Sequence, residues 1–582
     1  MKKVFGLLLS LMVLMGLGSC KKGHSVLTFV SSGESTISLE KAGEPLDISL
    51  EYSLDGKNWN TYTIGKKLGL LDGDELSFRA GEQGNDCFSY NDEDYYYFKI
   101  TGSVAAKGNI MSLLDRNCSR NSVPSFAFFN LFFDCIGLTS APDLPATELA
   151  EYCYTCMFAG CISLTSAPTL PATALAESCY AGMFSGCMSL TKAPTLPAMK
   201  LAESCYAWMF HGCSSLTKAP ALPAMELAEC CYSGMFQGCT SLIKTPKLPA
   251  MKLAERCYES MFADCTSLIE VPTRPATKLT ERCYEYMFTG RTSPVKTLVL
   301  PATELAVGCY LNMFNGCTSL TKAPSLPATK LAEECYLAMF KGCTSLTKAP
   351  SLPATKLAEE CYLAMFKGCT SLTEVPTLPA TELAESCYAW MFHGCSSLTK
   401  APALPAMELA ECCYSGMFQG CTNLTKAPEL PATELAKICY GEMFLGCTSL
   451  TTAPALPATK LAESCYSNMF LDCTSLIKAP ALPAMKLARY CYFGMFSGCT
   501  SLTKAPVLPA KYLNDRCYYA MFRGCTSLNF ITALFISYPY GEITFDWLYG
   551  VATTGIFVKS KDATWDVRGG NGIPEGWTVE IE

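Results

Sequence analysis

Cysteine is the residue type in this chain with the greatest capacity for chemistry, because 36 of the 582 residues are cysteines. Fifteen of them precede a tyrosine, from Cys153 to Cys517, and fourteen more follow a glycine or an aspartate, from Cys161 to Cys525. Neighbouring members of the two series lie eight residues apart in sequence, which is about 12 Å along a helix. A disulfide needs roughly 4.4 to 6.8 Å between Cα atoms, so we expect no pairing within one unit.

The two series of cysteines are also interrupted independently of each other. Arg291 replaces a cysteine of the second series while Cys283 of the first remains, and Ala127 replaces one of the first while Cys135 remains. Obligate disulfide partners would be lost together. We therefore predict two rows of small, buried, reduced side chains, with disulfides between successive units and metal binding as alternatives.

Candidates for catalysis are few. The chain has three histidines, His24, His211 and His393, and the last two occupy the same place in a copied block of sequence. An acidic run from Asp92 to Asp94 stands beside three tyrosines, and a carboxylate-based hydrolase there is a distant alternative. Because no phosphate-binding loop or other catalytic motif is found, we expect neither an enzyme nor a cofactor.

Most of the chain is one repeat of 26 residues. The unit L-P-A-T-x-L-A-E-x-C-Y-x-x-M-F-x-G-C-T-S-L-T-K-A-P-x begins at Leu144 and recurs fifteen times without an insertion or a deletion. A constant period is typical of a solenoid, since stacked coils bury a continuous core only when every coil has the same circumference. The block from Leu201 to Thr240 is identical to the block from Leu383 to Thr422, which indicates recent copying.

The spacing inside each unit predicts a short helix followed by a short strand. Cys179, Met183 and Cys187 lie four residues apart, as do Tyr180 and Phe184, which favours a helix with one wide apolar face. The S-L-T-K-A-P stretch that follows is typical of an extended segment ended by proline. The predicted fold is an α/β, leucine-rich-repeat-like solenoid with parallel strands; the alternative is an all-β coil in which the cysteine-rich segment is irregular.

The flanks of the array differ from the repeat. Alternating apolar residues around the Asp55-Gly56 turn predict a small all-β domain, and the period is lost after Leu528, where we expect a β-rich cap. The predicted organisation is a signal peptide at residues 1–19, an N-terminal β domain at 20–110, a solenoid at 111–528 with a degenerate capping coil at 118–143, and a C-terminal cap at 529–582.

The first residues predict export and lipidation. Lys2 and Lys3 precede an apolar stretch from Val4 to Leu17, which is too short to span a bilayer but suits a signal peptide. The stretch ends in L-G-S-C, which resembles a bacterial lipobox with Cys20 as the lipidated residue. An ordinary secretory signal is the alternative. We expect an exported lipoprotein held at the outer membrane by its N-terminal lipid and displayed on the cell surface.

Two charged positions recur along the array, and stacking would turn each into a row. Glutamate recurs at Glu151, Glu177, Glu203, Glu229, Glu255, Glu281, Glu333, Glu359, Glu385, Glu411 and Glu463. Lysine recurs at Lys192, Lys218, Lys244, Lys296, Lys322, Lys348, Lys400, Lys426, Lys478 and Lys504. We predict that the lysine row, beside the strands, belongs to a long binding face; the alternative is a solvated face that only keeps the array soluble. The net charge of −7 gives no basic excess, so we expect no nucleic acid partner.

One unit departs from the rest. Arg274, Thr280, Arg291 and Pro294 replace leucine, alanine, cysteine and leucine of the consensus. The substitutions indicate either decay tolerated by the neighbouring units or a kink or ligand notch in the array.

The M-F-x-G-C-x-S-L core, as from Met313 to Leu320, resembles the BspA-like leucine-rich-repeat surface proteins. The resemblance covers residues 118–528 and implies surface display, adhesion and binding of host or cell-surface proteins or glycans. One departure concerns export, because Lys21 and Lys22 follow Cys20 where such lipoproteins often carry acidic residues. A passive structural or antigenic coat is the alternative function.

Overall fold

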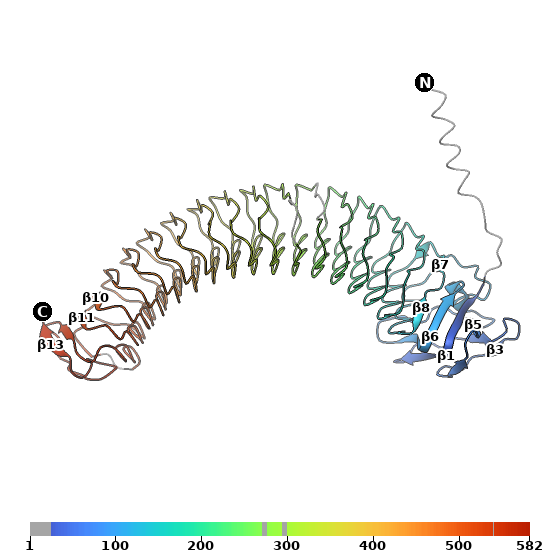
Figure 1. Cartoon of the computed structure of the whole chain (residues 1–582), viewed down its shortest axis with the longest axis horizontal. Helices are drawn as coiled ribbons and strands as arrows, with labels where there is room; N and C mark the ends of the chain where they lie inside the picture. Colours follow the sequence, from blue (N-terminus) through green and yellow to red (C-terminus); the bar gives the residue numbers. More distant parts are fainter. Residues whose placement is uncertain (1–24, 271–275, 294–298, 539–540) are drawn as a thin grey trace, which may run out of the picture.

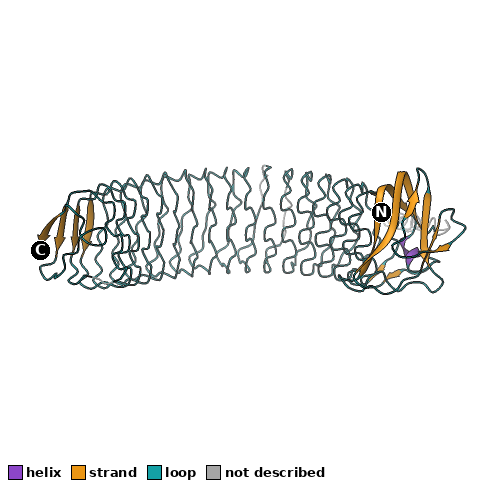
Figure 2. Cartoon of the chain, turned by 90° about the horizontal axis from the view of Figure 1, so that it is seen from below, coloured by secondary structure: helices purple, strands orange, loops and turns teal. Residues whose placement is uncertain are grey.

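The computed structural model describes residues 25–270, 276–293, 299–538 and 541–582. The chain forms a long arc of stacked coils with a β domain at its N-terminal end and a small sheet at its C-terminal end (Figure 1). Seen from below, the coils lie as successive rungs between these two ends (Figure 2). Some residues named above lie outside the described residues: the predicted signal segment with Cys20, and also Arg274, Pro294 and Lys296.

The N-terminal domain is a twisted sheet that continues directly into the solenoid. Its strands are β1 (Leu27–Ala42), β2 (Leu50–Ser53), β3 (Asn60–Thr61), β4 (Leu68–Leu70), β5 (Glu75–Ala80) and β6 (Tyr95–Lys107). The order is β3-β2-β5-β1-β6-β8, with β4 also paired to β1, and the last member, β8 (Leu138–Ser140), belongs to the degenerate coil. Inside the junction the rings of Phe98 and Phe132 stack at 5.2 Å, so domain and array share one core.

The short helix that the spacing predicted in each coil is not there. The segment is a run of β-turns, in which the N–H groups of Ala181 and Met183 donate to the carbonyls three residues earlier, at 3.1 and 3.3 Å. Every fourth residue takes the left-handed conformation, as Ser178 (φ 49°), Gly182 (φ 60°) and Gly186 (φ 72°) do, and such a residue ends a helix. Turns of four residues and helices both bring residues i and i+4 to one side, so the apolar spacing alone did not distinguish them.

The remaining N–H groups of this segment bond to the next coil. Tyr154 donates to the carbonyl of Cys179 at 3.0 Å, and Phe158 donates to that of Met183 at 2.9 Å. Because N–H groups alternate between bonds inside the coil and bonds to its neighbour, the buried backbone is satisfied without a helix. The extended segments add parallel bridges of single residues, such as Lys218 with Lys244. The coil is therefore a β-solenoid, and the all-β alternative describes it better than the α/β prediction.

Identical side chains stack on one another through the core. The rings of Tyr180 and Tyr206 lie 5.9 Å apart at 4°, and those of Phe184 and Phe210 lie 5.8 Å apart at 6°. The thiol of Cys187 donates to the carbonyl of Phe158 in the preceding coil at 3.1 Å. The cysteines of both series are buried, as the sequence predicted.

Short strands appear where the array begins and ends. At the N-terminal end, η1 (Ile110–Leu113) is followed by β7 (Ser122–Val123), which pairs in parallel with β9 (Glu148–Leu149). The C-terminal cap is a parallel sheet of β10 (Lys504–Leu508), β11 (Phe530–Ala533), β12 (Ile556–Lys559) and β13 (Thr578–Ile581). The indole of Trp547 fills its core and donates to the carbonyl of Gly572 at 3.0 Å. Within the described ranges, no helix is long and apolar enough to cross a membrane.

Candidate binding surface

The lysine row forms an exposed line along the solenoid. Nine of its ten members are described, and all nine are exposed; the tenth, Lys296, is outside the described residues. Parallel bridges join Lys218 to Lys244 and Lys400 to Lys426, so like charges occupy neighbouring coils at the same height. Like charges placed directly opposite one another on adjacent strands repel. The row is therefore a line of positive charge that solvent or a partner can reach.

Few carboxylates neutralise this row. The Nζ of Lys244 lies 3.4 Å from Glu270, and that of Lys348 lies 2.7 Å from Glu374, the two acidic residues that interrupt the row. In the part of the chain that the structure describes, seven members have no carboxylate within 4.0 Å: Lys192, Lys218, Lys322, Lys400, Lys426, Lys478 and Lys504. Most of the charge on this line is thus uncompensated by the protein itself.

A second charged row escaped the sequence analysis. It occupies the variable position of P-A-T-x-L, where lysine and glutamate face each other in adjacent coils. Their oxygen–nitrogen distances are 3.5 Å for Lys200–Glu226 and 3.1 Å for Lys356–Glu382, and Lys460–Glu434 also pair. Aligning the units and comparing each with the next would have revealed these opposite charges. Exposed pairs of this kind add little stability, but they leave this row nearly neutral.

The glutamate row lies beside the turn run and is locally crowded. Glu333 and Glu359 are exposed members, and Glu334 and Glu360 follow them at left-handed positions with φ of 54° and 51°. Burial, together with Glu334 and then Glu359, raises the pKa of Glu360. Negative charge is thus concentrated over these two coils.

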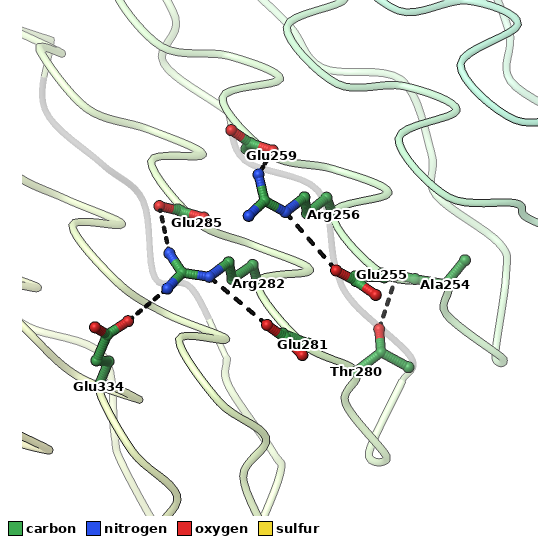
Figure 3. Close-up of polar contacts among 9 residues, drawn as sticks. All are labelled: Ala254, Glu255, Arg256, Glu259, Thr280, Glu281, Arg282, Glu285 and Glu334. Atoms are coloured by element: carbon green, nitrogen blue, oxygen red, sulfur yellow. Dashed lines mark hydrogen bonds and ion pairs between the residues drawn. The ribbon is translucent and has the colours of Figure 1, made fainter. Parts of the chain in front are cut away.

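Two arginines pair with glutamates in the middle of the array, and one of them, Arg282, also reaches another coil (Figure 3). Arg256 lies 3.7 Å from Glu259, and Arg282 lies 3.2 Å from Glu285 in the equivalent place one coil later. Arg282 also reaches Glu334, two coils away, at 2.7 Å. The coil between them carries Gly308 at this position, where a Cβ would lie 3.0 Å from the Cγ of Arg282. The absence of a side chain at Gly308 lets the guanidinium pass over it.

Arg291 stands inside the second cysteine row and is fully buried. One of its terminal nitrogens donates to the carbonyl of Leu268, while Nε and Nη1 have no hydrogen-bond partner among the described residues. Burial lowers the pKa of the guanidinium. The departure at Arg291 is therefore a buried guanidinium in the core with two nitrogens unpaired among the described residues.

The histidines and the acidic run have structural partners. The Nδ1 of His211 lies 3.2 Å from Ser185 Oγ, whereas that of His393 lies 3.1 Å from Gln419 Oε1, so the copied histidines have different surroundings. Asp94 accepts hydrogen bonds from the backbone of Glu44 at 2.7 Å and from the side chain of Asn91 at 2.9 Å, which ties two loops together. No group of three histidines, cysteines or carboxylates in the described ranges is arranged to hold a metal ion.

The model of one protein family matches this chain. The BspA-type leucine-rich repeat region, described over six copies, matches residues 129–269, 207–321, 281–425, 338–477 and 412–537. Searches among curated proteins and among solved structures found no match. The overlapping matches run from residue 129 to residue 537, which is more than half of the 582 residues. The chain belongs to the BspA-type leucine-rich repeat family.

Proposed function

We propose that this protein is a surface lipoprotein whose lysine row binds extended partners, either proteins or glycans of a host or of neighbouring cells. The observation that carries the proposal is the line of exposed lysines, seven of them without a described carboxylate partner. Neighbouring like charges repel one another, and an anionic partner laid along the row would relieve that repulsion. Binding, rather than catalysis, is the role that such a line supports.

The repetition of the coil suits a long partner better than a small one. Most coils offer the same lysine, and successive coils lie about 4.8 Å apart, so one partner chain can contact many coils at once. Linking weak contacts in this way can raise the overall affinity by about 10² to 10⁴. We therefore propose that affinity grows with the number of coils.

The test compares matched lysine variants on a panel of extracellular-matrix proteins and of sulfated and neutral glycans. One variant carries Lys322→Gln, Lys400→Gln, Lys426→Gln and Lys478→Gln. Its control carries Lys200→Gln, Lys330→Gln, Lys356→Gln and Lys460→Gln, which remove the same charge from the paired row. We expect binding to weaken strongly in the first variant and little in the second, and to weaken as whole coils are deleted. Equal effects of both variants would mean that net charge, not the row, drives binding.

A passive coat is the second candidate, because near-identical copying of units changes length and leaves the surface unchanged. If the protein is a passive coat, we expect the array to bind nothing on the panel at any number of coils. Cells that lack the protein should then attach as well as cells that have it. Binding that depends on the row excludes this function.

The anchor has a test of its own. We propose that Cys20 carries a lipid and that the array projects from the outer membrane, in line with the signal and lipobox pattern. In the Cys20→Ala variant we expect loss of lipid labelling and release from the membrane fraction. Protease treatment of intact cells then reports whether the array faces outward. A variant that keeps its lipid and stays with the membrane contradicts the assignment.

A further inference from the structure

A groove on the lysine side distinguishes three coils from the repetitive surface. It has a cavity volume of about 780 Å³ between the segments Thr217–Pro223 and Ile243–Pro249. A second hollow of about 680 Å³ joins Thr191–Pro197 to the same middle segment. The two hollows share the segment Thr217–Pro223, so together they make a channel that crosses three coils. We call it the coil 3–5 groove, because its three segments run into the third, fourth and fifth units counted from Leu144.

The coil 3–5 groove is apolar and bordered by further apolar side chains. Proline from all three segments lines it, together with alanine and leucine from the first two. Ile243 of the third segment is 43% exposed and stands where most units have threonine. Three exposed methionines each stand two residues after a proline that lines the groove: Met199 (53% exposed), Met225 (46%) and Met251 (57%). Exposed methionine is adaptable and suits surfaces that bind partners. Such a patch in successive coils goes beyond the scattered apolar residues expected on any surface.

Positive charge surrounds the coil 3–5 groove. Lys192, Lys218, Lys244 and Lys247 line it, and no carboxylate does. Of these, Lys244 lies 3.4 Å from Glu270, and the other three have no carboxylate within 4.0 Å in the described ranges. A complementary partner must therefore be both acidic and apolar.

The chain contains its own comparison for the coil 3–5 groove. The block that forms its middle segment, Leu201–Thr240, recurs unchanged as Leu383–Thr422. After the copy, threonine, alanine and glutamate occupy the places of Ile243, Thr245 and Lys247. The structure differs at the same place, since Pro220 and Pro246 are half-buried, whereas their counterparts are buried. The wall before the block differs as well, since Glu374 and Val375 occupy the places of Lys192 and Ala193. Identical sequence is thus packed differently between different neighbouring coils.

We propose that the coil 3–5 groove binds an extended acidic segment of a partner polypeptide that carries apolar side chains. The proposal rests on the proposed function of the array as a binding surface, and it names one site and one class of partner. Carboxylates of the segment would meet Lys192, Lys218 and Lys247, and its apolar side chains would enter the hollows between the prolines. The lining contains no aromatic ring on which a sugar could stack, so the groove favours a polypeptide over a glycan.

The test uses the full chain and a variant built from its own sequence. Ile243→Thr, Thr245→Ala and Lys247→Glu convert the second wall into that of the copied block, which the same fold already accommodates. The probe is a phage-displayed library of random dodecapeptides selected on the wild-type protein. We expect selected peptides to combine acidic with apolar residues, and their synthetic forms to bind the triple variant about tenfold or more weakly, because a charge reversal and an apolar contact are lost. The matched control is Glu374→Lys, Val375→Ala, Thr425→Ile, Ala427→Thr and Glu429→Lys, which converts both walls of the copied block and should create a second site.

Three results would overturn the inference. Selected peptides without acidic residues, or peptides that bind the triple variant as tightly as the wild type, would show that the groove does not recognise this class. Heparin fragments that bind the wild type and fail on the variant would assign the groove to a sulfated glycan instead. The lysine row outside the groove is intact in the triple variant. If the peptide proposal fails, binding that depends on the number of coils can therefore still be measured. If binding does not depend on the number of coils, the peptide result can still be measured.

Discussion

Most core positions hold the same residue type in successive coils, and Arg291 is the largest exception to this rule. Its neighbours in the row are Cys265 and Cys317, both buried free thiols. A guanidinium in the same place leaves Nε and Nη1 without partners in the described structure. Buried polar groups without hydrogen bonds destabilise the folded state, and a charged one does so more.

We expect Arg291→Cys to stabilise the array. Removing the unpaired donors should raise the free energy of unfolding by about 1–3 kcal/mol, because a cysteine fits the same place in fourteen other coils. Thermal unfolding followed by circular dichroism measures the change. The control, Cys317→Arg, should lower the melting temperature, and a stabilising effect of that control would contradict the account.

Glu360 makes stability depend on pH. Burial and neighbouring carboxylates raise its pKa in the folded state, so the folded protein binds a proton more tightly than the unfolded chain. Stability is then fully present below the unfolded pKa of about 4.3 and falls as pH rises through the folded pKa. We expect Glu360→Gln to raise the urea midpoint at pH 7 and to leave it unchanged near pH 3.5. The control, Glu434→Gln, loses an exposed pairing with Lys460 and should change the midpoint at pH 7 only slightly.

At the scale of the element, the cysteine-rich segment shows what the sequence predicted and where it fell short. The buried positions were predicted correctly, since Cys179, Met183 and Phe184 all lie in the core. The helix was wrong because spacing of four is common to helices and to successive β-turns. The informative signal was glycine in mid-segment, as at Gly182 and Gly234, since glycine there is unfavourable in a helix and suits a left-handed turn residue.

The glycine positions also constrain the neighbouring coil. Gly234 has φ of 59°, and a Cβ there would lie 2.6 Å from the indole of Trp208 one coil earlier. We expect Gly234→Ala to destabilise the protein by about 2–4 kcal/mol through left-handed strain and the clash together. Adding Trp208→Ala should recover only the part that is due to the clash. A double-mutant cycle by urea unfolding measures this coupling, and strictly additive effects would show that the indole is displaced freely.

The surface features were predictable to different degrees for a physical reason. The lysine row repeats in sequence, so its exposure could be predicted from the period. The paired row at P-A-T-x-L becomes apparent only when each unit is compared with the next. The coil 3–5 groove was not predictable, because Thr217–Pro223 has the same sequence as its copy and differs only in its packing on the neighbouring coils. Local sequence specifies each coil, whereas the distance between coils depends on pairs of them.

For the whole molecule, stability is a sum over coils and the contacts between neighbours. Residues 326–351 and 352–377 are nearly identical, so deleting residues 326–351 joins coils that meet as native neighbours do. We expect this deletion to fold with an unchanged melting temperature within a few degrees and a slightly smaller dependence on urea concentration, since less surface is buried. Deletion of 13 residues, half a coil, should abolish cooperative unfolding, and a cooperative transition in that variant would contradict the additive description.

The near-identity of neighbouring coils also creates a problem of register during folding. A coil that stacks on the neighbour beyond its own would loop out 26 residues and still form almost every ladder contact, and closing such a loop costs little more than closing a shorter one. Arg282 meets Glu334 across Gly308 only when the intervening coil is in place, and the indole of Trp208 finds a glycine only in the coil of Gly234. A slip that loops out the coil of Gly308 or the coil of Gly234 therefore loses one of these contacts. Such contacts stabilise the native stack relative to stacks in a slipped register.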